Sequence, residues 1–225
     1  MYYVIGDVHG RYKELMTLVR KLPKDAKLIF VGDLIDRGPD SAKVVKFVRE
    51  NNYPCVMGNH EHFMIAEGLI DGKAPTRWYE SFEKWYGEFG GDKTLQSYGI
   101  GEDYQEIVLA QESPKLKQFY DDIQWMKSLP HVIELGDCII NGRKAVISHS
   151  CVWPPWDKRR QNRAVFEEHV RNNREIPEDI EGIFNIYGHQ CKKQVETTFF
   201  SACIDISCNQ KLATLHIPSL SIMHT

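Results

Sequence analysis

Hydrophobic and polar positions along the first sixty residues predict a β-α-β-α-β unit. Three apolar runs of strand length, each followed by glycine, are separated by two stretches with helical spacing. The runs are YYVI (2–5), KLIFV (27–31) and YPCVM (53–57). The helical stretches contain Tyr12, Leu15, Met16 and Val19, then Val44, Val45, Phe47 and Val48. Such units join parallel strands through right-handed crossovers, so we expect three parallel strands.

The middle and the end of the chain follow other patterns. Residues from about 61 to 129 are rich in Trp, Tyr, Glu and Lys, and their spacing favours a mostly helical insertion broken at YGEFGGDK (86–93) and SYGIGED (97–103). The aromatic residues are expected in the core, although WYGEFGG (85–91) could line a substrate cleft. After Pro130, strand-like runs predict a second sheet, with one helix at about 163–172. These runs are HVIEL, KAVIS, GIFNIY and KLATLHI.

Length and composition fit one domain, residues 1–225. The chain is 42% hydrophobic and 26% charged, and its formal net charge of -3 gives no electrostatic reason to expect a nucleic-acid or membrane partner. No apolar run reaches the roughly 20 residues that span a bilayer, and no signal peptide is evident, which predicts a soluble, cytoplasmic protein. The six cysteines are scattered and are expected to be reduced, mostly structural thiols.

Polar clusters beside glycine or serine follow five of the β-rich runs. They read GDVHG (6–10), GDLIDRG (32–38), GNHEH (58–62), ISHS (147–150) and YGHQ (187–190). In open α/β sheets, the crevice at the carboxyl ends of parallel strands is the usual site, so the first three clusters should converge there. Taken singly, each aspartate could cap a helix and each histidine could be a buried structural residue.

Together, these clusters indicate a metal centre. Two aspartates, three histidines and one asparagine form an oxygen and imidazole set that suits divalent transition metals. Because six ligands are generous for one ion, an aspartate shared between two ions explains the number. Two ions 3.5 to 4 Å apart clamp the oxygens of a phosphoryl displacement and make hydroxide available near neutral pH. The chain contains no GxSxG, Walker GxxxxGK[ST] or GxGxxG motif.

The sequence resembles the calcineurin-like metallophosphoesterases, and within them the phosphoprotein phosphatases, whose signatures GDxHG, GDxxDRG and GNHE occur here in order. The similarity spans residues 6 to 189 and is strongest to compact serine/threonine protein phosphatases of the bacteriophage lambda type. The GG after an aromatic segment and NNRE between the two late histidines support it. The resemblance implies an α/β fold in which a β-sandwich with a βαβαβ metal-binding core is flanked by helices.

The resemblance also implies a role for each matching residue. Asp7 and His9 would hold the first metal, and Asp33 would bridge both ions. Asn59, His149 and His189 would hold the second metal. The expected ions are Mn²⁺, with Fe and Zn²⁺ also suited.

Catalytic and substrate-binding roles follow in the same way. His60 matches the general acid and Asp36 its carboxylate partner, an arrangement that raises the pKa of an imidazole. Arg37 matches an arginine that binds phosphate oxygens, and Arg174, in NNRE, aligns more loosely with a second one.

Several of these residues have alternative interpretations. Arg37 could pair with Asp36 or Asp40 on the surface. Arg171 or Arg163 could take the place of Arg174. His62 and His131 are expected to be structural or solvated, and Glu61 to favour the N-terminal end of the next helix.

Met57 is where the sequence departs from the resembling protein phosphatases, which mostly carry a phosphate-contacting arginine before GNHE. Resembling diadenosine tetraphosphate hydrolases have an apolar residue there. We therefore expect metal-dependent hydrolysis of phosphomonoesters, with phosphoserine and phosphothreonine in proteins as the leading substrates. The alternatives are hydrolysis of dinucleoside polyphosphates or cyclic nucleotides at the same metals, or a non-catalytic, metal-stabilised binding protein.

Overall fold

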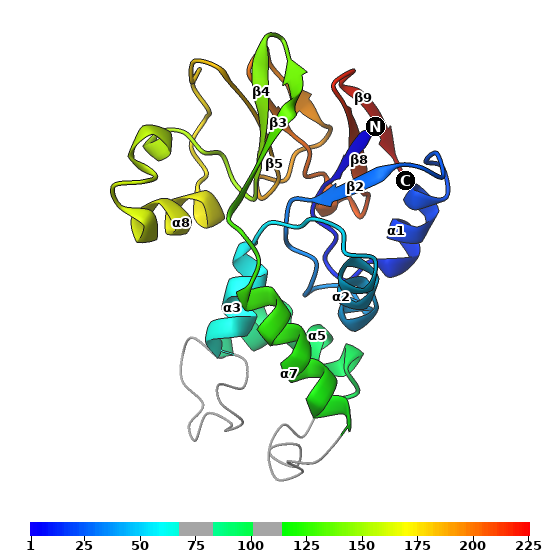
Figure 1. The fold of residues 1–225 in the computed structure, drawn as a ribbon. Helices are drawn as coiled ribbons and strands as arrows, with labels where there is room; N and C mark the ends of the chain where they lie inside the picture. The colour runs from blue at the N-terminus through cyan, green and yellow to red at the C-terminus, as the bar shows by residue number, and fades with distance from the viewer. Residues whose placement is uncertain (68–82, 101–113) are drawn as a thin grey trace.

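The computed structural model describes residues 1–67, 83–100 and 114–225, which form two β-sheets flanked by helices (Figure 1). The first sheet has the strand order β2-β1-β8-β9. Its strands are β1 (Tyr2–Ile5), β2 (Lys27–Phe30), β8 (Ala213–Ile217) and β9 (Ser221–His224). Helices α1 (Tyr12–Val19) and α2 (Ser41–Glu50) fill the two predicted gaps. The expected parallel pairing of the first two strands is confirmed, since Tyr2 lies opposite Lys27 and Ile5 opposite Phe30.

Two details of the predicted sheets are wrong. The third run, 53–57, forms only an isolated parallel bridge between Phe30 and Cys55, because the backbone N–H of Met57 turns away to donate to the carbonyl of Pro130. KLATLHI was expected in the second sheet, but it forms β8, which pairs antiparallel with β1. The apolar pattern of KLATLHI could not reveal which sheet it joins.

The second sheet has the order β3-β4-β5-β7-β6. Its strands are β3 (Val132–Ile140), β4 (Arg143–Ser148), β5 (Ile183–Tyr187), β6 (Glu196–Thr197) and β7 (Ser201–Cys203). The pairs β4–β5 and β5–β7 are parallel, so the segments after β4, β5 and β7 leave the same edge of the sheet. Helix α8 (Arg163–Asn172) begins where Asn162 accepts a hydrogen bond from the N–H of Val165.

The core is layered. One apolar cluster lies between the two sheets and contains Val4, Ile29, Ile147, Phe184 and Ile204, all at most 1% exposed. A second cluster joins the first sheet to α1, α2 and the helical insertion, and a third packs α8 with the 3-10 helix η2 (Pro155–Lys158) against the second sheet. This order of helix, sheet, sheet and helix is the predicted β-sandwich flanked by helices.

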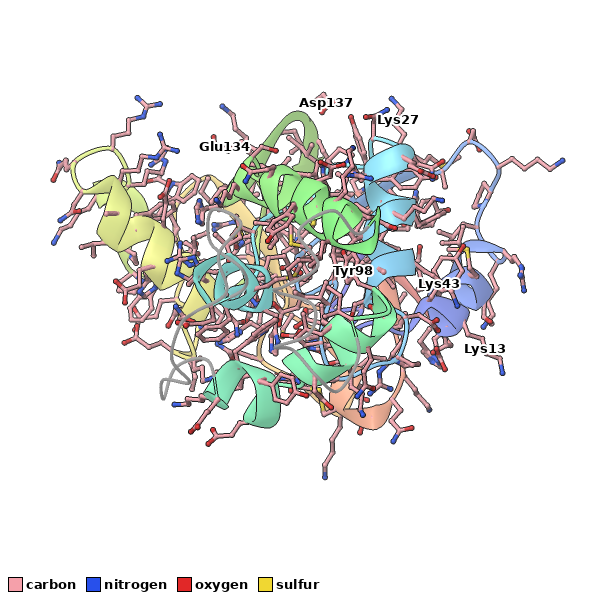
Figure 2. All side chains as sticks on the ribbon, turned by 90° about the horizontal axis from the view of Figure 1, so that it is seen from below. Lys13, Lys27, Lys43, Tyr98, Glu134 and Asp137 are labelled. Carbon is pink, nitrogen blue, oxygen red and sulfur yellow. A yellow bond between two sulfur atoms is a disulfide. The ribbon has the colours of Figure 1, made fainter. Side chains whose placement is uncertain are left out.

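The described part of the insertion is helical, as predicted. It contains α3 (Asn59–Glu67), the π-helical turn η1 (Lys84–Glu88), α5 (Gly91–Ser97) and α7 (Pro114–Lys127); residues 68–82 and 101–113 of the expected insertion lie outside the described residues. A buried network docks it on α2, because Tyr98 donates to Asp122 at 2.9 Å and Arg49 lies 2.8 Å from the same carboxylate. Tyr98 lies within the outline of the molecule, whereas Lys13 lies near its edge (Figure 2).

Among the described residues, no helix is long and apolar enough to cross a membrane. The 3-10 turn η3 (Ser207–Asn209) lies between β7 and β8.

Candidate dinuclear metal centre

The predicted metal ligands and His60 converge at the edge where β1, β2, β4 and β5 end. All are buried except Asn59, the first residue of α3, which is partly exposed. Five of the predicted site residues have a positive φ although they are not glycine: His9, Asp33, Asp36, Arg37 and His189, with φ of 46°, 49°, 69°, 66° and 64°. Such strained backbone is uncommon and concentrates at functional sites.

The second predicted site is formed by three electron-donating atoms that face one another. His149 Nε2 and His189 Nδ1 each lie 2.9 Å from Asn59 Oδ1, and the two nitrogens are 3.2 Å apart. His149 Nδ1 lies 2.8 Å from the carbonyl of Val31, so its proton is placed there and the Nε2 lone pair points into the site. Two imidazole nitrogens and an amide oxygen at these distances form a donor set that fits a divalent ion.

The first predicted site faces the other oxygen of Asp33. Asp33 Oδ1 lies 3.4 Å from His149 Nε2, and Asp33 Oδ2 lies 3.6 Å from His9 Nε2. The Nδ1 of His9 is 3.0 Å from the carbonyl of Ile35, so the proton is placed there, and the His9 Nε2 lone pair accepts from the Arg37 guanidinium at 2.8 Å. Asp33 therefore presents one carboxylate oxygen to each site, an arrangement that suits a bridging ligand.

Asp7 is held beside these ligands by the backbone that carries His189. The N–H of His189 lies 3.1 and 3.3 Å from the two Asp7 oxygens. Gly188 permits this approach, because a Cβ there would lie 1.9 Å from Asp7 Oδ1. Two clusters share Asp33, and the donor atoms in each lie within 4.8 Å of one another: His9, Asp33 and His60 form one, and Asp33, His149 and His189 form the other. Asp7 belongs to neither cluster.

The protonation states of the site residues are compatible with bound cations. Burial, with the nearby anions Asp205 and Asp33, raises the pKa of Asp7 well above its ordinary value. Burial also lowers the pKa of His9 and His149, and brings that of His189 to about 3, so these imidazoles are neutral at pH 7. Neutral imidazoles and deprotonated carboxylates are the forms in which histidine and aspartate generally bind metal ions.

His60 and Asp36 form the predicted acid pair. His60 Nδ1 lies 2.6 Å from Asp36 Oδ2, and neither side chain is more than 2% exposed. Burial opposes the charged imidazole, but Asp33 and Asp36 outweigh it and raise the pKa of His60. The edge of the His60 ring packs against the stacked rings of Phe63 and Phe89.

The arginines differ in position. The guanidinium of Arg37 lies 2.8 Å from His9 Nε2 and 3.1 Å from His60 Nε2, which places it on the metal centre. Arg174 is exposed, and its charge contributes to the low pKa of His189. Of its alternatives, Arg163 pairs with Glu167 on α8, and Arg171 lies 2.8 Å from His131.

Two buried acids were not expected in the site. Glu61, fully buried, accepts hydrogen bonds from the backbone N–H groups of Asp33, Leu34 and Gly58 at 2.8 to 3.0 Å, so it fixes two ligand-bearing loops. Glu61 does lie in the first turn of α3, as predicted, but its carboxylate contacts are to the loops. Asp205 follows β7, is 2% exposed, and helps to raise the pKa of Asp7. The sequence could have indicated Asp205, because it directly follows the apolar run Ala202–Ile204, as the predicted ligands follow other strand-like runs.

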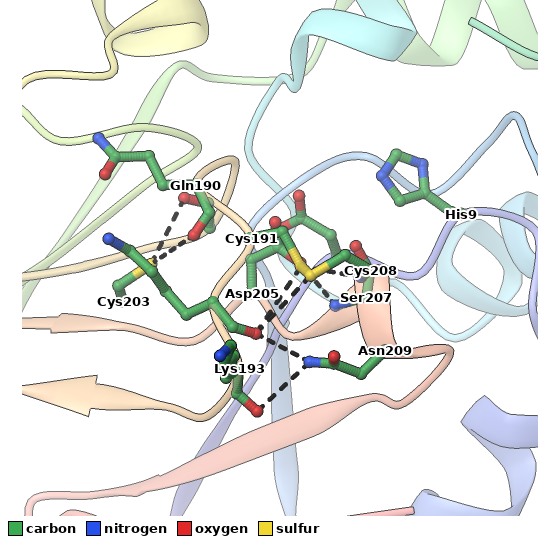
Figure 3. The surroundings of a disulfide bond; sticks show 12 residues. His9, Gln190, Cys191, Lys193, Cys203, Asp205, Ser207, Cys208 and Asn209 are labelled. Carbon is green, nitrogen blue, oxygen red and sulfur yellow. Dashed lines mark hydrogen bonds between the residues drawn. A yellow bond between two sulfur atoms is a disulfide. The ribbon is translucent and has the colours of Figure 1, made fainter.

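The expectation of six reduced cysteines is wrong for one pair. Cys191 and Cys208 form a disulfide, with a Cα–Cα distance of 5.9 Å (Figure 3). It joins the segment after β5, which carries His189, to the segment after β7, which carries Asp205. The pairing arises because the two strands are parallel neighbours, which a separation of 17 residues does not reveal. The other four cysteines are buried free thiols.

Comparison with known proteins agrees with this geometry. Residues 2–193 match the family described as calcineurin-like phosphoesterase. The chain belongs to this family. Members of the family use a dinuclear metal centre.

Two curated relatives to which the chain is similar have different activities. A symmetrical bis(5'-nucleosyl)-tetraphosphatase from Erwinia tasmaniensis is 29% identical over 160 residues, which cover 69% of this chain and 46% of that protein. Serine/threonine-protein phosphatase 1 from Salmonella typhimurium is 34% identical over 115 residues, half of each chain. The alignments thus span about half or less of these relatives' lengths.

Solved structures support the fold. A crystal structure assigned provisionally to a diadenosine tetraphosphatase has a TM-score of 0.63 at 19% identity and covers 100% of this chain and 92% of that one. A serine/threonine phosphatase from Saccharomyces cerevisiae has a TM-score of 0.51 at 14% identity and covers 100% and 78%. Both establish the calcineurin-like arrangement of sheets and helices.

Proposed function

We propose that the chain hydrolyses a phosphate ester or anhydride at two divalent ions. The supporting observation is the convergence of lone pairs around Asp33, one group on each carboxylate oxygen. Asp7, His9 and Asp33 would hold one ion; Asp33, Asn59, His149 and His189 would hold the other. When bound, the ions supply Lewis acidity that polarises the phosphoryl oxygens and activates water. Mn²⁺ is our first candidate, and Fe and Zn²⁺ suit the same ligands.

His60 and Arg37 then have complementary roles. Asp36 at Nδ1 orients the His60 ring, so Nε2 can carry the proton that neutralises the leaving oxygen when its bond to phosphorus breaks. Arg37 reaches both His9 and His60, so its planar fork is placed to bind the oxygens of a phosphate between them. Arg174 would contribute at longer range.

Two substrate classes have support, and we place dinucleoside polyphosphates first. Met57 is 5% exposed and belongs to the apolar core, so the position before GNH adds no positive charge to the site. The Erwinia relative is a symmetrical tetraphosphatase. In symmetrical cleavage, water would add to one inner phosphorus, the central P–O–P bond would break, and His60 would protonate the departing nucleoside diphosphate.

Phosphoserine and phosphothreonine in proteins are the second class. The Salmonella relative, which shares half its length with this chain, is a serine/threonine-protein phosphatase. A phosphomonoester needs only the ions, Arg37 and the His60 acid, all of which fit the described site.

A parallel assay separates these proposals. Purified protein with Mn²⁺ is given diadenosine tetraphosphate, a phosphoserine peptide, a cyclic nucleotide and p-nitrophenyl phosphate, before and after EDTA. We expect metal-dependent turnover, with the highest kcat/KM on diadenosine tetraphosphate; a higher value on the peptide reverses our order. No turnover of any substrate with Mn²⁺, Fe²⁺ or Zn²⁺ would refute the enzyme and support a metal-stabilised binding protein.

A further inference from the structure

The helical insertion contacts the carboxylate that orients His60. Asp36 is fully buried, and Thr94 of α5 donates to its Oδ1 at 2.6 Å. The indole N–H of Trp85, in η1, donates to Oδ2 at 3.1 Å, beside the contact with His60 Nδ1 at 2.6 Å. Both carboxylate oxygens are therefore hydrogen-bonded, and two of the three side-chain donors come from a segment remote in sequence from Asp36.

The same segment also contacts the backbone around Asp36. The N–H of Asp36 donates to Thr94 Oγ1 at 2.9 Å, and the N–H of Arg37 donates to the carbonyl of Gly90 at 3.3 Å. Gly90 has a φ of 85°, and a Cβ there would lie 2.6 Å from Arg37 N. Gly90 thus lets the insertion lie directly on the Asp36–Arg37 turn, and Gly91 makes room for the Trp85 ring, since a Cβ there would lie 2.5 Å from it.

We propose that Trp85 and Thr94 are positioning residues for the proton-donating His60: they fix the Asp36 carboxylate so that the imidazole is aimed at the leaving oxygen. This inference rests on the proposed phosphoester hydrolysis. It gives the WYGEFGG segment a function in the acid pair, whereas the sequence alone favours the core for its aromatic residues, or a substrate cleft. It also means that the acid is assembled only when the insertion is docked.

Docking of the insertion does not depend on these two hydrogen bonds. Tyr98, Asp122 and Arg49 join it to α2 through a buried network, and Ser97 Oγ accepts from the N–H of Ala42 at 3.0 Å. Thr94→Val keeps the shape of the side chain and Trp85→Phe keeps an aromatic ring, so both variants should fold. Thr94→Ser keeps the hydroxyl, and Ser97→Ala is the matched control, since it removes the contact with Ala42 and a bond to the backbone carbonyl of Thr94 but no contact with Asp36.

The first test compares leaving groups at saturating Mn²⁺. A general acid matters for phenyl phosphate, whose phenolate leaves poorly, and little for p-nitrophenyl phosphate. Thr94→Val and Trp85→Phe should each lower kcat on phenyl phosphate about tenfold, equivalent to about 1.4 kcal/mol. They should change kcat on p-nitrophenyl phosphate less than about twofold and leave KM on both substrates unchanged. Thr94→Ser and Ser97→Ala should match the wild type.

A double-mutant cycle then separates positioning from general structure. In a His60→Asn background, Thr94→Val should have no further effect on kcat, because the residue it positions is gone. An equal loss on both leaving groups, or a loss that persists in the His60→Asn background, overturns the proposal.

A measurement that does not depend on turnover tests the positioning of His60 separately from the proposed hydrolysis. In ¹⁵N-histidine-labelled protein, the His60 Nδ1–H resonance, assigned by its loss in His60→Asn, should exchange with water about tenfold faster in Thr94→Val but not in Ser97→Ala. Unchanged exchange refutes the positioning role even if the enzyme is active. Absence of wild-type turnover refutes the proposed function, and the exchange result still decides the positioning.

Discussion

Gly188→Ala is the change that tests the metal centre with the least alteration of chemistry. Gly188 separates β5 from His189, and an added Cβ would lie 1.9 Å from Asp7 Oδ1 and 2.8 Å from the Val31 side chain. The backbone cannot easily retreat, because the N–H of Gly188 donates to the carbonyl of His149 at 2.8 Å and the N–H of His189 donates to Asp7.

The size of the effect follows from these distances. Real Cβ contacts essentially never fall below 3.0 Å, so Asp7 or the His189 segment must move by about 1 Å or more. Metal–ligand distances tolerate about 0.2 Å. We therefore expect Mn²⁺ to bind at the Asp7 site at least 100-fold more weakly, and kcat on p-nitrophenyl phosphate to fall about 100-fold at micromolar Mn²⁺, since a 1 Å misplacement costs about that much.

Calorimetric titration of metal-free protein with Mn²⁺ measures this directly. Wild type should bind two ions per chain and Gly188→Ala about one in the micromolar range. Gly136→Ala is the control, because nothing lies within 4 Å of a Cβ at that position. Two ions bound with wild-type affinity in Gly188→Ala, at a turnover within threefold of wild type, would show that Asp7 does not bind metal as inferred.

Three further predictions concern other groups. Asp33→Asn should abolish both metal binding and activity, whereas His60→Asn should keep two bound ions and lower kcat on phenyl phosphate by at least 100-fold; metal loss in His60→Asn, measured by elemental analysis, would mean that His60 is a ligand. Reduction of the Cys191–Cys208 disulfide, which closes a loop of 17 residues, should lower the unfolding free energy by about 3 kcal/mol in urea titrations, with no effect of reductant when both cysteines are serine. Burial lowers the pKa of His131 to about 4, so the folded protein binds fewer protons than the unfolded chain and loses stability as pH falls from 6.5 to 4. Over that interval His131→Gln should lose about 1–2 kcal/mol less unfolding free energy than the wild type. Equal losses in the two proteins would contradict the buried neutral imidazole.

The convergence of the predicted ligands could be expected from the sequence, because these residues follow strand-like runs within short motifs. Asp7, His9, Asp33 and Asn59 lie within a few residues of the runs that carry them, and parallel pairing brings the ends of such runs together. His149 and His189 have the same position after β4 and β5. Local pattern was sufficient for these residues, since each ligand's place is set by the strand before it.

The missing parts depend on contacts between distant segments. Glu61 fixes the backbone of Asp33, 28 residues away, and Thr94 reaches Asp36 across 58 residues. The hydrophobic periodicity of a sequence does not indicate which distant residues will be in contact. The Cys191–Cys208 pair and the position of β8 have the same origin, because both depend on which strands become neighbours. Asp205 could have been predicted, since it follows an apolar run as the other site residues do. It was missed because β7 is only three residues long.

The most direct test of the dinuclear centre is anomalous diffraction from crystals grown with Mn²⁺. We predict two anomalous peaks about 3.5 to 4 Å apart, bridged by Asp33. One should be bonded to Asp7 and His9, and the other to Asn59, His149 and His189. A single peak, or peaks bonded to other residues, would contradict the prediction.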